Sequence, residues 1–250
     1  MLKEAVAIAE SRGFKLIHGI VDSMWLKKPN ATEEEYRTLC DQIEHQLGLP
    51  ISFEGRYKWM VFLNSRIDPR VPVLNRYYGI FQDGTLKVRG IDLRRHDSPE
   101  IVRKCQAGML EVLSHASDSE QFRALVPSAL SVMKHCVSLL RSGKVPVEDL
   151  VIEKRLSKMP DEYRNLGPQA VAARHLARER GSIHAGQNVS FIISNRDSKI
   201  ADKRAMPIEL VDHSGMYDSA AYVELIISCA TNLFLPFDLS IDKLKVEVGS

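Results

Sequence analysis

The sequence of 250 residues has few cysteines and no long apolar run. Its four cysteines, at positions 40, 105, 136 and 229, include no Cys-x-x-Cys pair. This spacing argues against a zinc site or a disulfide framework and is typical of reduced cytosolic thiols. The apolar stretch 225–237 is too short for a membrane span, and Lys3 and Glu4 interrupt any signal-peptide pattern. We therefore expect a cytoplasmic protein without membrane contact.

The sequence also lacks a large net charge, with 34 Lys and Arg against 32 Asp and Glu. The charges are unevenly distributed, however. Residues 54–104 carry 11 basic and 6 acidic side chains, and residues 134–204 carry 14 and 8. This asymmetry is typical of a nucleic-acid-binding face backed by an acidic surface. Chance patchiness of a solvated surface is the alternative interpretation.

Residue periodicity predicts an α+β fold that changes character near residue 98. Before this point, it predicts helices at 1–12 and 32–46 and strands at 14–21, 24–28, 51–64, 73–81 and 86–93. Beyond it, with Ser98 as N-cap and Pro99 as the first helical residue, helical patterns cover 99–115, 118–142, 147–156, 167–180 and 217–234, with a strand at 189–195. We therefore predict a mixed domain at 1–97 and a mostly helical domain at 98–250.

Glycine is scattered, and no glycine-rich phosphate loop occurs, which disfavours an unrelated α/β nucleotide-binding enzyme. The first candidate for chemistry is Asp22, at the predicted turn Asp22-Ser23 between two apolar strands. A carboxylate exposed there is suited to a hard cation such as magnesium. Asp-Ser is also a common turn pair, and one carboxylate does not build a magnesium site alone.

The segment HGIVDSMWLKK (18–28) resembles motif C of family-B DNA polymerases, which is usually written with Asp-Thr-Asp-Ser at its turn. Further segments resemble the family in the right order: FEGRYKWMVFLN, NRYYGIFQDGTLKVRG, IDLRRHDSPEIVRKCQAGMLEVL, YRNLGPQAVAARHLARERG and MYDSAAYVELI. The resemblance covers nearly the whole chain and is greatest to archaeal members. It implies the C-terminal part of a palm domain at 1–97 and a thumb domain at 98–250.

The resemblance implies catalytic roles for two acidic positions. Asp22 falls on the second Asp of the motif C turn, the carboxylate that holds catalytic Mg²⁺ in this family. Ile20 stands where the family has its first Asp. Glu54 falls on a Glu near the metal site and has an auxiliary role at most; a solvated strand end is the equal alternative.

The resemblance also implies DNA contacts, made to phosphates without reading sequence. Arg76 and Tyr78 fall on the Lys and Tyr of the Lys-x-Tyr segment, near the primer end, although alternation along the strand predicts that either Tyr77 or Tyr78 lies in the core. Four basic side chains near the palm–thumb junction are further candidates: Arg89, Arg94, Arg95 and His96. Each alone fits a solvated surface charge better, and as a cluster in a basic zone they favour phosphate. Along the thumb, the candidates for its side of the DNA groove are Lys154, Arg155, Lys158, Arg164, Arg174, Arg178 and Arg180. His175 fits a structural role or a phosphate contact.

No segment resembles motif A, the fingers or the exonuclease domain of the family. The chain begins one short helix before motif C, so it resembles the small subunit of a split, nucleoid-associated polymerase. Its large subunit would carry the rest of the palm, the fingers and an exonuclease, and the complex would bind primer-template DNA and dNTP. A truncated polymerase would have the same sequence. The alternative is a polymerase-derived DNA-binding or scaffold subunit, catalytically silenced at Ile20.

Overall fold

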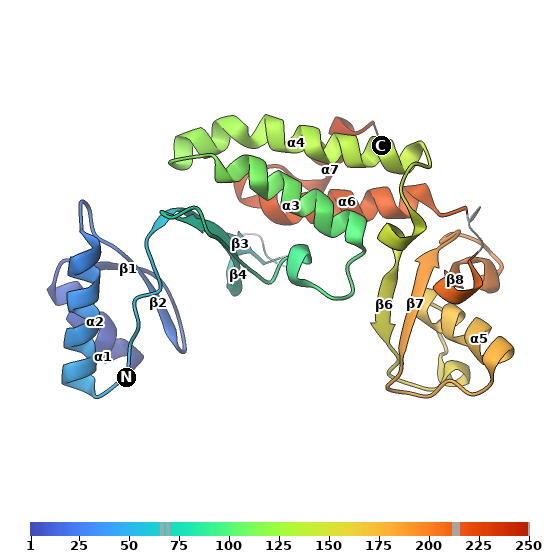
Figure 1. The fold of residues 1–250 in the computed structure, drawn as a ribbon, viewed down its shortest axis with the longest axis horizontal. Coiled ribbons are helices and arrows are strands. Elements are labelled where there is room, and N and C mark those ends of the chain that lie inside the picture. Colours follow the sequence, from blue (N-terminus) through green and yellow to red (C-terminus); the bar gives the residue numbers. More distant parts are fainter. Residues whose placement is uncertain (66–67, 69–70, 212–215, 250) are drawn as a thin grey trace. The chain divides into compact units, whose positions relative to one another are not determined.

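The computed structural model describes residues 1–65, 68, 71–211 and 216–249, and the chain divides into two compact units (Figure 1). Unit 1 is Met1–Arg89 and unit 2 is Gly90–Ser250. The predicted α+β class is confirmed, with small antiparallel sheets in both units. The structural division precedes the predicted boundary at 97/98 because residues in the intervening segment bond to helices of unit 2.

Unit 1 begins with two helices and a hairpin: α1 (Leu2–Ser11), β1 (Lys15–Ile20), β2 (Ser23–Lys27) and α2 (Glu33–Leu47). Thr32 and Glu35 form a capping box at the start of α2, since the Glu35 amide donates to Thr32 Oγ1 at 3.2 Å and the Thr32 amide donates to Glu35 Oε2 at 2.8 Å. Apolar side chains of both helices form one core cluster with the residue that precedes β1: Ala5, Ala9, Phe14, Leu39 and Ile43.

The second sheet of unit 1 contains β3 (Tyr57–Asn64), β4 (Pro72–Phe81) and β5 (Leu86–Arg89), antiparallel with β4 in the centre. Tyr77 and Tyr78 lie on opposite faces of β4, and both are buried. The ring centroid of Tyr77 lies 5.1 Å from that of Trp25, and the centroid of Tyr78 lies 6.1 Å from that of Trp59. Aromatic packing on both faces of the strand therefore makes both tyrosines core residues.

His18 joins the hairpin to this sheet. Its ring packs against Trp25 of β2 and Phe62 of β3, with centroid separations of 5.2 and 4.4 Å. Its Nε2 lies 3.0 Å from the carbonyl oxygen of Leu74 in β4. Stacking and one hydrogen bond thus fix the orientation of the hairpin within unit 1.

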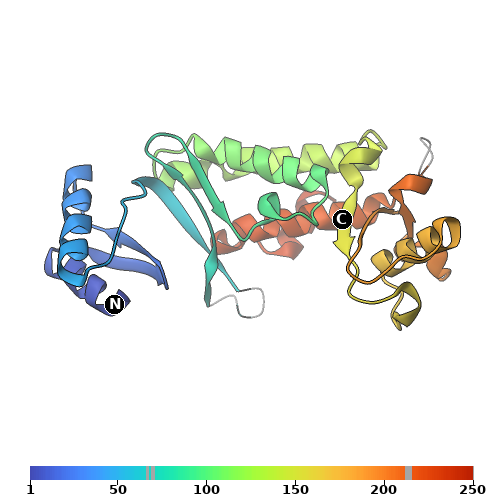
Figure 2. The same ribbon diagram turned by 60° about the horizontal axis from the view of Figure 1, so that its bottom comes forward.

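Four helices form the main core of unit 2: α3 (Glu100–Ser114), α4 (Ser119–Arg141), α6 (Ser219–Phe234) and α7 (Ile241–Glu247). They pack against one another as neighbours (Figures 1 and 2). The segment Ser219–Phe237 is the one stretch of the described chain long and apolar enough to cross a membrane. Most of its side chains are buried against α3, α4 and α7, which is typical of a core helix.

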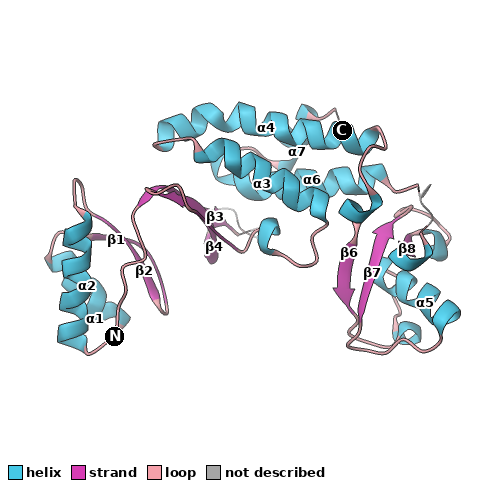
Figure 3. Cartoon of the chain, in the orientation of Figure 1, coloured by secondary structure: helices cyan, strands magenta, loops and turns pink. Residues whose placement is uncertain are grey.

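Unit 2 also contains a three-stranded antiparallel sheet, β6 (Ile152–Arg155), β7 (Asn188–Ile193) and β8 (Ala205–Pro207), with α5 (Pro168–Arg180) against β7 and β8 (Figure 3). The prediction of a helix at 147–156 was wrong. A 3-10 turn and β6 occupy this segment, because Ile152–Arg155 pair with β7 instead of continuing a helix. That 3-10 turn is Val147–Leu150, and others cover Asp92–Arg94, Pro160–Glu162, Ala201–Lys203, Ile208–Leu210 and Leu235–Phe237.

Two helix boundaries also differ from the sequence prediction. Helix α3 begins at Glu100 with Pro99 as its N-cap, and Ser98 lies before the cap with its side chain buried. The predicted N-cap role of Ser98 was therefore wrong by one position. The short helix α7 was not predicted, although Ser240 accepts a hydrogen bond from the Lys243 amide at its start.

The hydroxyl of Tyr222 in α6 connects the 3-10 turn Val147–Leu150 and strand β7. We predict that Tyr222→Phe lowers the free energy of unfolding by about 1–3 kcal/mol. The hydroxyl donates to the Leu150 carbonyl at 2.7 Å and accepts from the Ile193 amide at 2.9 Å. Removing it leaves two buried backbone groups without a partner. Urea denaturation followed by circular dichroism measures the change. Tyr36→Phe is the control, because the Tyr36 hydroxyl lies 3.5 Å from its acceptor, and an equal loss in both variants would contradict the prediction.

Candidate functional site

The tip of the β1–β2 hairpin presents Asp22 to solvent. Val21 and Asp22 form the two-residue turn, and Ile20 pairs with Ser23 across it. The predicted turn is therefore displaced by one residue, since Ser23 is the first residue of β2. The Ser23 hydroxyl lies 3.4 Å from Asp22 Oδ1, and Val21 is 97 % exposed. Two paired strands thus hold an accessible carboxylate at a defined position.

The described residues do not form a metal site by themselves. A magnesium or calcium ion takes six or more oxygen ligands, several of which usually come from protein carboxylates or carbonyls. Within residues 1–65, 68, 71–211 and 216–249 there is no group of three His, Cys, Asp or Glu side chains able to hold a metal. The second predicted ligand, Glu54, is exposed and forms an ion pair with Lys87 of β5. Asp22 alone fits a metal only as one ligand among others.

Strand β4 carries the two predicted DNA contacts Arg76 and Tyr78, with different accessibility. Arg76 is half-buried. Tyr78 is fully buried, and this burial raises the pKa of its hydroxyl. Alternation along the strand predicted that one of the two neighbouring tyrosines lies in the core, and the structure buries both. A contact between DNA and Tyr78 stays a prediction, and in this structure its ring faces protein.

Arg89 is the exposed last residue of β5 in unit 1, and the other predicted junction residues begin unit 2. Arg94, Arg95 and His96 are exposed at the end of the 3-10 turn Asp92–Arg94. We call these three residues the basic turn. Their side chains reach solvent from a backbone that is closely bonded to the helices behind it.

Two buried amide side chains hold the basic turn, and sequence reasoning missed both. Gln106 of α3 is fully buried, and its Oε1 accepts from the Leu93 amide at 2.6 Å. Asn232 of α6 donates to Asp92 Oδ2 at 2.8 Å. Their signal in the sequence is a polar residue on the apolar face of a helix. The turn is therefore pre-organised, with its backbone fixed from inside the unit.

An ion pair joins Arg95 to Asp97, and a cation of a second predicted DNA-binding segment acts on the same carboxylate. Arg95 Nε and Nη2 each donate to a different oxygen of Asp97 at 2.9 Å. This pairing holds the pKa of the Asp97 carboxyl below its usual range, and the charge of Lys154 on β6 lowers it further. Lys154 therefore lies close to the basic turn, although the two are far apart in the sequence.

The remaining predicted cations divide into exposed and structural groups. Lys158 and Arg164 are exposed. The guanidinium of Arg155 donates to the Gly186 carbonyl at 2.9 Å, and half-buried Arg174 donates to the Pro160 carbonyl at 3.1 Å. Both side chains bond to backbone carbonyls of unit 2, and of the two Arg155 remains exposed whereas Arg174 is half-buried.

The last residues of α5 face acidic partners. Arg178 pairs with Asp202 at 2.6 Å and Arg180 with Glu209 at 3.6 Å. The Nε2 atom of His175 lies 2.8 Å from the Asp202 carbonyl oxygen. His175 therefore contacts the backbone of the 3-10 turn Ala201–Lys203, as its expected structural role requires.

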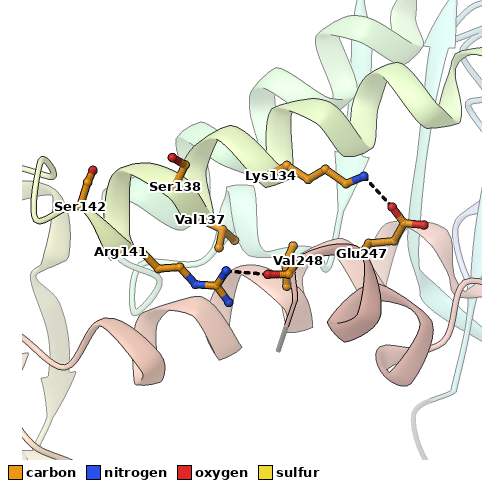
Figure 4. Close-up of a pocket in the computed structure, with 7 residues that line it drawn as sticks. All are labelled: Lys134, Val137, Ser138, Arg141, Ser142, Glu247 and Val248. Carbon is orange, nitrogen blue, oxygen red and sulfur yellow. Dashed lines mark hydrogen bonds and ion pairs between the residues drawn. The ribbon is translucent and has the colours of Figure 1, made fainter.

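A pocket between α4 and α7 contains none of the predicted site residues (Figure 4). Arg141 donates to the Val248 carbonyl at 2.6 Å, and Lys134 pairs with Glu247 at 2.6 Å. These cations bind the C-terminal end of α7, where carbonyl groups have no helical partner. The pocket side chains therefore anchor a helix end.

The chain is similar to DNA polymerases of one family. The family model described as DNA polymerase family B matches residues 2–237. A DNA polymerase of Archaeoglobus fulgidus is 31% identical over 212 residues, which are 84% of this chain and 25% of that protein. A DNA polymerase of Thermococcus kodakarensis is 27% identical over 224 residues, 87% of this chain and 12% of that protein.

A solved structure shows the same likeness in three dimensions. The family B DNA polymerase from the hyperthermophilic archaeon Pyrobaculum calidifontis matches with a TM-score of 0.65 and 27% identity. The match covers 92% of this chain and 28% of that one. The chain thus spans between 12% and 28% of the length of the relatives described.

We expect the bonded and the exposed arginines to differ in how much they contribute to the free energy of unfolding. We expect Arg174→Met to lower the free energy of unfolding by about 1 kcal/mol, because it removes the bond to the Pro160 carbonyl while keeping an apolar stem. Arg164→Met, on the exposed surface, should change it by less than about 0.5 kcal/mol. Urea denaturation compares the two variants, and similar losses in both would refute the distinction.

Proposed function

This chain belongs to DNA polymerase family B, and from that premise we propose that it is the C-terminal subunit of a DNA-directed DNA polymerase. Residues 1–97 supply the motif C part of the palm, and residues 98–250 form the thumb. The observation that carries the proposal is the exposed Asp22 at the tip of a tight hairpin. A polymerase of this kind works on chromosomal DNA, so we place it with the nucleoid in the cytoplasm.

In this proposal Asp22 is one carboxylate ligand of a catalytic magnesium site. A divalent metal in nucleotidyl transfer stabilises the charge on phosphoryl oxygens. The hairpin contributes position, because strand pairing and the packing of His18 hold Asp22 in place relative to the β3–β5 sheet. The ion pair between Glu54 and Lys87 supports at most an auxiliary role for Glu54.

The other ligands come from a large subunit that carries the rest of the palm, the fingers and an exonuclease domain. Two observations support this partner. The described residues include no further ligands grouped around Asp22. Large apolar side chains of unit 1 are also exposed, among them Ile17, Val21 and Leu74.

Unit 2 grips the primer-template duplex by its phosphates. Cations with exposed side chains suit this role, since phosphate contacts release counterions and provide affinity without sequence selection. The basic turn with Lys154, and Lys158 with Arg164, are the groups that support it. Arg76 and Arg89 are further candidates in unit 1.

A second candidate function is a silenced subunit that binds DNA without contributing to catalysis. Ile20 supports this alternative, because an aliphatic side chain stands where the family has its first motif C aspartate. The two functions differ in one respect, which is whether Asp22 holds metal in the assembled complex.

Substitution of Asp22 separates the two functions. We expect Asp22→Asn to reduce primer extension by the chain and its copurifying partner about 100-fold or more, because a metal ligand is lost. Binding of primer-template DNA should remain. Primer extension with magnesium measures activity, and fluorescence anisotropy measures binding. Asp41→Asn on the exposed face of α2 is the matched control, and full activity of Asp22→Asn would favour the silenced subunit.

The proposed partner also predicts the behaviour of the isolated chain. We expect it to self-associate in sedimentation velocity, because apolar side chains of unit 1 that the proposed partner would bury are exposed to solvent. The double substitution Ile17→Lys and Leu74→Lys should shift the distribution towards the monomer, since these side chains are 48% and 56% exposed. A wild-type chain that stays monomeric at micromolar concentration would argue against the partner.

A further inference from the structure

In the ion pair between Arg95 and Asp97, the carboxylate occupies a guanidinium fork, two nitrogens whose spacing also fits two oxygens of a phosphate. The two nitrogens Nε and Nη2 point in parallel at two oxygens, each 2.9 Å away. Arginine binds phosphate with this same fork, because two phosphate oxygens have similar spacing to those of a carboxylate. Both side chains reach solvent, with 48% of Arg95 and 35% of Asp97 exposed. A backbone phosphate can therefore approach the same nitrogens.

A second cation acts on the same carboxylate from a different element. Lys154 extends from β6, which pairs with β7 through Val189. Its charge acts on Asp97, whereas it makes no hydrogen bond or ion pair of its own with a side chain in the described ranges. The charges of two cations thus act on one aspartate, and each cation suits a phosphate.

The fold does not need this ion pair to hold the basic turn. The Arg95 amide donates to the Asp92 carbonyl at 3.0 Å, and the Asp92 carboxylate is bonded to Asn232. Gln106 holds the Leu93 amide from the other side. The backbone of the turn is fixed by these contacts, so Asp97 can lose its charge without unfolding it.

We infer that Asp97 competes with DNA phosphate for Arg95 and thereby limits the affinity of the chain for duplex. The inference rests on the proposed duplex-binding role of unit 2 and adds a residue that opposes binding. In the free chain the carboxylate occupies the guanidinium fork, and a phosphate displaces it when duplex binds. Exposed ion pairs are weak enough to exchange in this way.

Asp97→Asn tests the inference, because it keeps the shape of the side chain and removes its charge. We expect this variant to bind a fluorescein-labelled primer-template duplex about three- to tenfold more tightly in fluorescence anisotropy. The gain should be greatest at low salt, because salt screens the repulsion between the displaced Asp97 carboxylate and the phosphates. Asp242→Asn, an exposed aspartate at the start of α7, is the matched control for charge.

Arg95→Gln, alone and combined with Asp97→Asn, completes a double-mutant cycle. In that background Asp97→Asn should give a smaller gain, since the fork is absent and only Lys154 remains. Unchanged or weaker binding by Asp97→Asn, with wild-type binding intact, would overturn the inference and leave the duplex-binding role standing. A gain equal to that of Asp242→Asn would also overturn it. Binding by neither wild type nor variant would overturn both proposals together.

Discussion

The carboxylate of Asp92 connects the segment that begins unit 2 to the helices behind it. Asn232 donates to its Oδ2, and the amide of Gln106 lies 3.5 Å from the same atom while its carbonyl accepts from Leu93. A buried polar network of this kind is stable only when each member has a partner. Because these partners come from α3 and α6, the position of the basic turn depends on the helix that follows it and on a helix far along the sequence.

Local patterns predicted most elements of the fold. Helices α1 to α6 and the two hairpins of unit 1 were found because periodicity, capping residues and turn residues agree with the final packing. Residues 147–156 show why the rest was missed. Their composition permits a helix, and only pairing of β6 with β7 makes them a strand. Such pairing joins residues that no local pattern connects. Helix α7 is too short for its periodicity to show.

The candidate site was predictable in part, for the same reason. The resemblance to motif C identifies Asp22 because the hairpin that carries it is local. It also marks Tyr78, yet aromatic rings from β2 and β3 line both faces of β4 and enclose the tyrosines. Arginines look alike in sequence, and the structure separates Arg174, bonded to a loop carbonyl, from exposed Arg164. Gln106 and Asn232 become meaningful only when their hydrogen bonds are known.

The pairing of Ile20 with Ser23 has a consequence for how such a hairpin changes over evolution. The register is set by backbone hydrogen bonds and by side chains further along the strands, such as His18 and Trp25. Residue 20 therefore contributes little to the geometry that positions Asp22. An acidic and an aliphatic residue there differ in charge, shape and strand propensity, while the backbone pairing with Ser23 is open to both. A change of side chain at position 20 thus alters the charge beside Asp22 while the pairing across the turn remains.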